Sequence, residues 1–271
     1  MRSPKESALE TKIIGLITDL KLSGKILQTI ELALADQEIQ ALQDYANTVA
    51  IKRLGYNDHG PVHMRTVALN ALIMMQLLNS AGVRCNLEQE EWGTFEDSLV
   101  AVFLAAFLHD IGMSISRQDH ELYSAYLAYP LINRILGQVY RGVFQKYIAV
   151  QSLALEGISG HMGNRLIHSL EAGIILIADG CDMTKGRARI PMVIATSPKV
   201  GDIHRYSANA IESVRLSRGE QKAIRIEIAM SSEVGLFQVE AVLLGKIAAS
   251  PAKELLELYA TVQGAEAKQY L

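Results

Sequence analysis

Apolar residues recur at helical spacing over most of this chain, from Ser7 to about Thr184. Over the same stretch, valine, isoleucine and threonine do not gather into the short alternating runs that are typical of strands. The pattern therefore predicts a mostly helical fold. With 271 residues and a hydrophobic fraction of 49%, the chain has enough apolar material for one large core with a smaller appendage.

Start and stop signals divide this stretch into successive helices. We expect the first of these to be capped by Asp58 or His59, to begin near Pro61 and to end at Gly82. The other expected helices run from Thr94, which forms a capping box with Asp97, to Gly112; from Asp119 with an interruption at Pro130; from about Val139 to Gly160; and from about Ser169 to Ala178.

The pattern changes after Lys185. Segment 186–208 carries two glycines and two prolines and predicts a long ordered connection or a crossing loop. Segments 211–216 and 223–230 follow, and the second alternates apolar and polar residues, so we expect the two to form a β-hairpin. With an amphipathic stretch at 235–247 and a final segment at 252–262, they form a small α+β unit. The expected fold is mainly α, with a helical domain at 1–190 and a connecting segment and small α+β domain at 191–271.

Composition excludes several classes of protein. The runs 67–78 and 99–108 are far shorter than the ~20 apolar residues that span a bilayer, so we expect no membrane segment. The balance of 26 basic against 29 acidic residues argues against nucleic acid as a partner. Two cysteines, Cys85 and Cys181, cannot form a disulfide framework, which favours a cytoplasmic location.

Several histidines and aspartates occupy inward positions of the predicted helices. They are His63, His109, Asp110, His161 and Asp179. Each alone is more often a satisfied core histidine or a helix-terminal carboxylate, but burying all of them without partners would cost several kcal/mol each. Imidazole and carboxylate together form the ligand set of a divalent transition metal, which would compensate all of them at once. Arg65, two residues beyond His63, is expected to point outward as a surface charge.

The spacing of these residues resembles a known signature. The segments HGPVH (59–63), LHDIG (108–112) and IADG (177–180) are similar to the His…His-Asp…Asp signature of the HD-domain metal-dependent phosphohydrolases, over about residues 50–190. The resemblance implies an HD-type helical bundle. It also implies that His63, His109, Asp110 and Asp179 are the primary metal ligands.

Two further histidines match ligands of the two-metal branch of that superfamily. They are His120 and His161, and with them the resemblance implies two divalent transition ions (Mn, Fe, Ni, Co or Zn) bridged by Asp110. A solvated histidine in the first turn of a helix is the plain alternative for His120. For His59 the resemblance implies a proton donor rather than a ligand; a helix cap or a contact to a ligand is the alternative.

Such a centre implies hydrolysis by a metal-activated hydroxide, with Asp110 and His59 as catalytic residues. Lys185, Arg187 and Arg189 follow Asp179 closely enough to bind substrate phosphate, and the first two are also candidate catalytic residues; a solvated loop is their alternative. We expect a phosphohydrolase of a small phosphorylated, nucleotide-like substrate, either a monoester or a diester.

Other readings remain open. A metal-stabilised regulatory protein would bind nucleotide without turnover, and oxygen-using di-iron chemistry ranks last because the arginines after Asp179 give it no support. The cluster of Asp202, His204 and Arg205 is expected to form a lid or a subunit contact. The exposed edge of the hairpin favours a homodimer.

Overall fold

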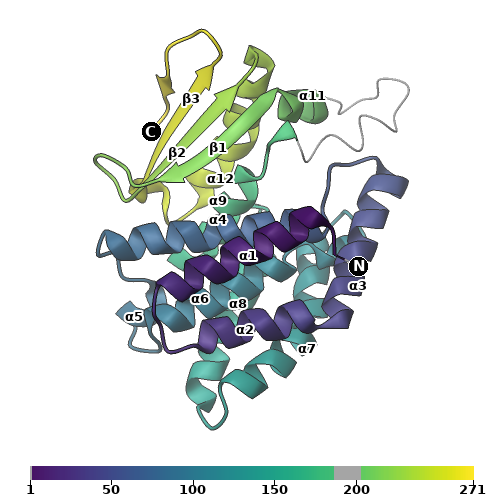
Figure 1. The fold of residues 1–271 in the computed structure, drawn as a ribbon, viewed down its shortest axis with the longest axis vertical. Coiled ribbons are helices and arrows are strands. Elements are labelled where there is room, and N and C mark those ends of the chain that lie inside the picture. Colours follow the sequence, from purple (N-terminus) through teal and green to yellow (C-terminus); the bar gives the residue numbers. More distant parts are fainter. Residues whose placement is uncertain (1, 186–202) are drawn as a thin grey trace.

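The computed structural model describes residues 2–185 and 203–271, without the side chains of residues 203–205. Figure 1 shows a helical body with a sheet packed at one end of it. The expectation of a mainly α fold with a small C-terminal α+β unit is confirmed.

The helices of the body follow one another with short connections. They are α1 (Pro4–Asp19), α2 (Lys25–Ala35), α3 (Gln37–Thr48), α4 (Pro61–Ser80), α5 (Asn86–Gln89), α6 (Phe95–Leu108), α7 (His120–Val139), α8 (Phe144–Gly160) and α9 (Leu170–Cys181). A π-helical turn at Val49–Leu54 extends α3. A 3-10 turn at Ile111–Ser114 follows α6.

Two of these helices form the centre of the body. Every residue of α6 and of α9 is buried, because helices surround them on all sides. A helix that is apolar around its whole circumference belongs in a core. The stretch Phe95–Ser114, which contains α6, is long and apolar enough to cross a membrane, but 94% of its apolar window is buried inside the fold.

Several helix ends differ from the expected ones. The helix that starts at Pro61 has Gly60 at its N-cap position and not Asp58 or His59, and the Asp58 side chain accepts a hydrogen bond from the Gly60 N–H at 2.8 Å. The capping box of Thr94 and Asp97 is confirmed. However, α6 ends at Leu108 and not at Gly112, and α8 begins at Phe144 and not near Val139. The expected interruption at Pro130 is wrong, since α7 continues through it.

The C-terminal unit is a four-stranded sheet with short helices. Its elements are α11 (Ile203–Ala210), β1 (Ile211–Ser217), β2 (Ile224–Met230), α12 (Leu244–Ala249), β3 (Leu256–Val262) and β4 (Lys268–Gln269), with helical turns at Glu233–Gly235, Gln238–Leu243 and Lys253–Leu255. The expected hairpin is confirmed, because β1 pairs with β2 in antiparallel register. The final segment expected at 252–262 contains β3, which pairs parallel to β2, although its strand character was not specified. The short strand β4, which pairs antiparallel to β3, was not expected.

Candidate metal centre

Six side chains from five helical segments meet inside the helical body. His63 lies in the first turn of α4, His109 caps α6 and is followed by Asp110, His120 opens α7, His161 caps α8, and Asp179 lies in the last turn of α9. Each of the six is at most 8% exposed. The helix ends therefore converge on one buried point.

Hydrogen bonds fix the ring orientation of the four histidines. Nδ1 of His63 lies 2.7 Å from Oδ2 of Asp182. In His109, His120 and His161, Nδ1 lies 2.7–3.0 Å from the carbonyl oxygen three residues earlier. Because these oxygens only accept, each Nδ1 carries a proton, and in the neutral imidazole each Nε2 then presents a lone pair. Partners of this kind orient histidines that bind metals.

A first group of four ligand atoms, which we call site A, combines two imidazoles and two carboxylates. Nε2 of His63 lies 3.1 Å from Nε2 of His109, 3.2 Å from Oδ2 of Asp110 and 3.2 Å from Oδ1 of Asp179. Nε2 of His109 lies 3.4 Å from the same Asp110 oxygen and 3.8 Å from the Asp179 oxygen. Site A thus contains the four residues that the signature predicts.

A second group, site B, uses the other oxygen of the same aspartate. Oδ1 of Asp110 lies 3.1 Å from Nε2 of His120 and 3.5 Å from Nε2 of His161, and the two Nε2 atoms are 3.1 Å apart. Asp110 therefore faces site A with one oxygen and site B with the other. The solvated alternative for His120 is wrong, because its side chain is buried.

The donor set fits divalent transition ions. Two nitrogen lone pairs that face each other at 3.1 Å, as in both sites, repel unless a cation or a proton lies between them. Ligand atoms at ~2.1 Å from one ion lie about 3.0–3.4 Å apart in octahedral or tetrahedral geometry. Most separations in the two sites are close to that range. Both groups could therefore hold an ion without rearrangement of the fold.

The charges agree with this chemistry. Burial alone would raise the pKa of Asp110, but the adjacent His109, His59 and His120 hold it well below its usual range. Burial would also raise the pKa of Asp179, but Lys246 and His63 keep this pKa well below its usual range. Burial lowers the pKa of His161 to about 4, so this imidazole is neutral at pH 7. Ionised carboxylates and neutral imidazoles are the forms that bind metals.

Comparison with known proteins agrees with this geometry. The uncharacterized protein MJ1020 of Methanocaldococcus jannaschii is 40% identical over 228 residues, which cover 84% of this chain and 86% of that protein. A family model described as HD domain matches residues 62–184. This chain belongs to the HD-domain family. No solved structure matches it. HD domains bind divalent metals and are generally metal-dependent hydrolases, which agrees with the sequence resemblance.

A glycine allows the second half of the HD centre to form. Gly112, in the turn after Asp110, packs against the first turn of α7: a Cβ there would lie 2.2 Å from the carbonyl oxygen of His120 and 2.4 Å from the nitrogen of Ser124. The N–H of Gly112 also donates to Oγ of Ser124 at 2.8 Å. This close approach places His120 beside Asp110.

Sequence reasoning missed two residues that contact the ligands. Asp182 binds the Nδ1 proton of His63, and its position three residues after Asp179 was an available signal. Lys246, from α12, donates to Oδ2 of Asp179 and to the carbonyl oxygen of His161, both at 2.7 Å. Nothing in the sequence links Lys246 to a site more than sixty residues away, because the contact depends on how the C-terminal unit docks.

His59 lies next to this HD centre. Its ring centroid is 5.8 Å from that of His63, and its side chain is half-buried. Nδ1 lies 2.6 Å from the carbonyl oxygen of Asn57 and so carries a proton. Nε2 is then the atom that can gain or lose one. The predicted role of His59 as proton donor is compatible with this arrangement and stays a prediction.

The predicted phosphate-binding residues lie partly outside the described residues. Arg187, Arg189 and Asp202 are not described, nor are the side chains of His204 and Arg205. The half-exposed Lys185 forms an ion pair with Glu212 of β1. Its ammonium thus neutralises a surface carboxylate in this structure, and its binding of phosphate stays a prediction.

The expectation that Arg65 of α4 points outward as a surface charge is wrong. Its side chain is fully buried rather than a surface charge. Nε donates to Glu10 at 2.8 Å, and NH1 donates to Oε1 of Gln43 at 2.9 Å. The reason is that α1 covers the outer side of α4, so α4 is buried on more than one face.

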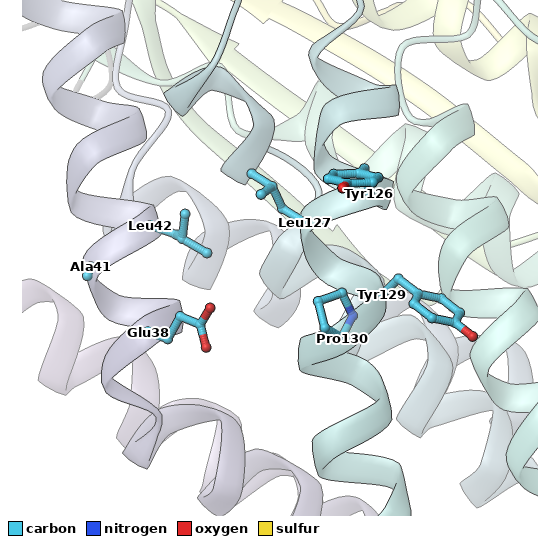
Figure 2. Close-up of a pocket in the computed structure, with 7 residues that line it drawn as sticks. All are labelled: Glu38, Ala41, Leu42, Tyr126, Leu127, Tyr129 and Pro130. Carbon is cyan, nitrogen blue, oxygen red and sulfur yellow. The ribbon is translucent and has the colours of Figure 1, made fainter.

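A separate hollow lies between α3 and α7 (Figure 2). Its volume is about 640 Å³, and it is lined by Glu38, Ala41, Leu42, Tyr126, Leu127, Tyr129 and Pro130. Pro130 has no N–H, so α7 lacks the usual helical bond to the carbonyl of Tyr126 at this point. Apart from one carboxylate, the described lining is apolar and aromatic. The hollow thus offers a mainly apolar surface for contacts, whereas the candidate metal ligands lie in the HD centre.

Proposed function

We propose that this protein is a metal-dependent phosphohydrolase that cleaves a phosphomonoester or phosphodiester bond of a small nucleotide-like substrate. One observation carries the proposal: each oxygen of the buried Asp110 faces its own set of imidazole nitrogens. A carboxylate shared in this way is suited to two neighbouring cations. Paired cations in such sites stabilise both the attacking and the leaving oxygen at phosphorus.

Each site would use its own set of side chains as ligands, with Asp110 common to both. His63, His109, Asp110 and Asp179 would hold one ion in site A, and Asp110, His120 and His161 the other in site B. Mixed nitrogen and oxygen ligands suit Mn, Fe, Co, Ni or Zn. Bound ions would polarise phosphoryl oxygens and lower the pKa of water held at the centre.

The chain's own groups would complete the reaction. We propose that His59 holds a proton on Nε2 and donates it to the leaving oxygen, while the carbonyl of Asn57 keeps the ring in place through Nδ1. Arg187 and Arg189 come six and eight residues after the end of α9 in the sequence, and their forked guanidinium groups suit the remaining phosphate charge. Lys185 would have to leave Glu212 to join them.

Metal analysis combined with a phosphate-release screen over nucleotide monoesters and diesters tests the proposal. The wild-type protein is expected to contain about two ions per chain and to release phosphate or open a diester. His109→Ala and Asp110→Ala are expected to lose both metal and activity. His168→Ala is the matched control, because His168 is exposed and should change neither.

The same experiment separates the alternative functions. Folded His109→Ala and Asp110→Ala variants with unchanged metal content would contradict the proposed centre. Metal and nucleotide binding without any bond cleavage would select the regulatory protein. A mixed-valent iron pair in electron paramagnetic resonance would select oxygen chemistry.

We further propose a cytoplasmic homodimer with no nucleic-acid or membrane partner. The free, buried Cys85 and Cys181 support a reducing compartment. β1 is an edge strand of the sheet that the described residues form, and pairing with a second subunit would cover it. A monomer in analytical ultracentrifugation at micromolar concentration would contradict the dimer.

A further inference from the structure

The C-terminal unit packs closely against the helix that carries Asp179, and two glycines of α9 face this contact. A Cβ at Gly180 would lie 2.9 Å from Cδ1 of Leu243 and 3.0 Å from Cδ of Lys246. One at Gly173 would lie 2.5 Å from Oγ of Ser250. The two glycines are seven residues apart and so lie on one face of α9. That face receives α12 and the turn after it.

The side chain that this approach delivers is Lys246. It is 12% exposed, and its ammonium lies 2.7 Å from Oδ2 of Asp179 and 2.7 Å from the carbonyl oxygen of His161. Asp179 belongs to site A and His161 to site B. One cation from the C-terminal unit therefore contacts residues of both sites.

The two oxygens of Asp179 have different partners. Oδ1 faces Nε2 of His63 in site A, whereas Oδ2 receives the Lys246 ammonium. An ammonium held in this way fixes the carboxylate plane and turns one oxygen toward the site. It also balances part of the negative charge that Asp110, Asp179 and Asp182 bring to the interior.

We propose that Lys246 is a positioning residue and a built-in counter-charge of the metal centre, supplied by the C-terminal unit. Without metal, it is a principal cation for Asp179. With metal bound, the ions also balance the negative charge of Asp179. This inference rests on the metal-binding part of the proposed function and not on the reaction.

The test compares the thermal unfolding of variants with chelator and with Mn²⁺. In chelator, Lys246→Met is expected to lower the Tm by about 6–15 °C, because the buried Asp179 loses its cation. With Mn²⁺ the loss is expected to be less than half as large. Lys246→Arg keeps the charge and is expected to recover most of the loss. Lys253→Met, at an exposed lysine paired with its neighbour Glu254, should match the wild type in both conditions.

A second variant tests the docking. Gly180→Ala keeps the lysine at position 246, but the new Cβ presses on the side chains of Leu243 and Lys246 and so moves the ammonium away from Asp179. Its stabilisation by Mn²⁺ is therefore also expected to exceed that of the wild type. Equal losses for Lys246→Met with and without Mn²⁺ would show a packing contact and overturn the inference. Failure of that variant to fold even with Mn²⁺ would do the same. If Mn²⁺ does not stabilise the wild type, the metal centre itself is wrong.

Discussion

Replacement of Arg65 by methionine tests whether the charge buried beneath α1 stabilises the fold. The guanidinium donates to Glu10, to Gln43 and, at 3.1 Å, to the carbonyl of Pro61, and it lies 5.0 Å from the ring centroid of Phe107. Methionine fills similar space but leaves these acceptors unpaired. Loss of one partner of a buried ion pair costs about 3–5 kcal/mol.

The structure places this variant at the lower end of that range. Glu10 keeps a second partner, since NH1 of Arg2 lies 2.7 Å from its other oxygen. We therefore expect a loss of about 3 kcal/mol, which lowers the Tm by about 6–12 °C in a chain of this size. Circular dichroism melts at pH 7 in chelator measure it.

An exposed arginine provides the control. Arg134 pairs with Asp36 at 2.6 Å and with Glu38 at 3.0 Å, but its side chain is 45% exposed. Arg134→Met is expected to cost at most about 1 kcal/mol, because water screens such pairs. If the two variants lose the same stability, burial does not decide the strength of these pairs and the reasoning is refuted.

Three further predictions concern the HD centre and the first turn of α6. Gly112→Ala is expected to displace His120 and to reduce the metal content by about one ion per chain, as measured by elemental analysis. Burial opposes ionisation of Asp97, but hydrogen bonds from Tyr140 and Lys146 lower its pKa from 3.8 to about 2. Its ionised form therefore adds about 2 kcal/mol above pH 4, and that stability is lost as the pH falls from 4 through 2. Urea unfolding should show Asp97→Asn less stable at pH 7, with the gap closing toward pH 2. Mn²⁺ at about 100 times its Kd should stabilise the wild type by about 2.7 kcal/mol, and a Tm that does not respond to Mn²⁺ would contradict this.

Most of the helical body could be predicted from the sequence because its apolar pattern directly reflects burial in the core. Every face of α6 and α9 is buried, and their continuous apolar runs reflect it. Pro130 misled the prediction because α7 continues packing beyond it with Leu131 and Ile132, which outweighs one lost backbone bond. Local signals could not reveal that compensation.

The strand β3 escaped prediction for a different reason. Its residues alternate in type, with Leu256, Leu258 and Ala260 separated by Glu257 and Tyr259, so a strand signal was available. The strand pairs parallel to β2 through a long connection, and no local turn signal marks such a pairing. Glu257 is tolerated there because Arg225 pairs with it at 2.9 Å.

The predicted ligands converge because helical register places His63, His109, Asp110, His161 and Asp179 inward, whereas His120 was expected there only from the family resemblance. Helical register could not show that α1 covers the outer side of α4, and for this reason Arg65 is buried and not on the surface. Lys246 depends on contacts between distant segments, and so no local pattern pointed to it.

The docking of α12 on α9 also bears on where this protein can be divided. A fragment ending at residue 184, where the match to the family model ends, would retain all six candidate ligands. It would nevertheless expose the glycine-lined face of α9 to water and remove the ammonium from Asp179. Such a fragment would bind ions in a different electrostatic setting from that of the intact chain.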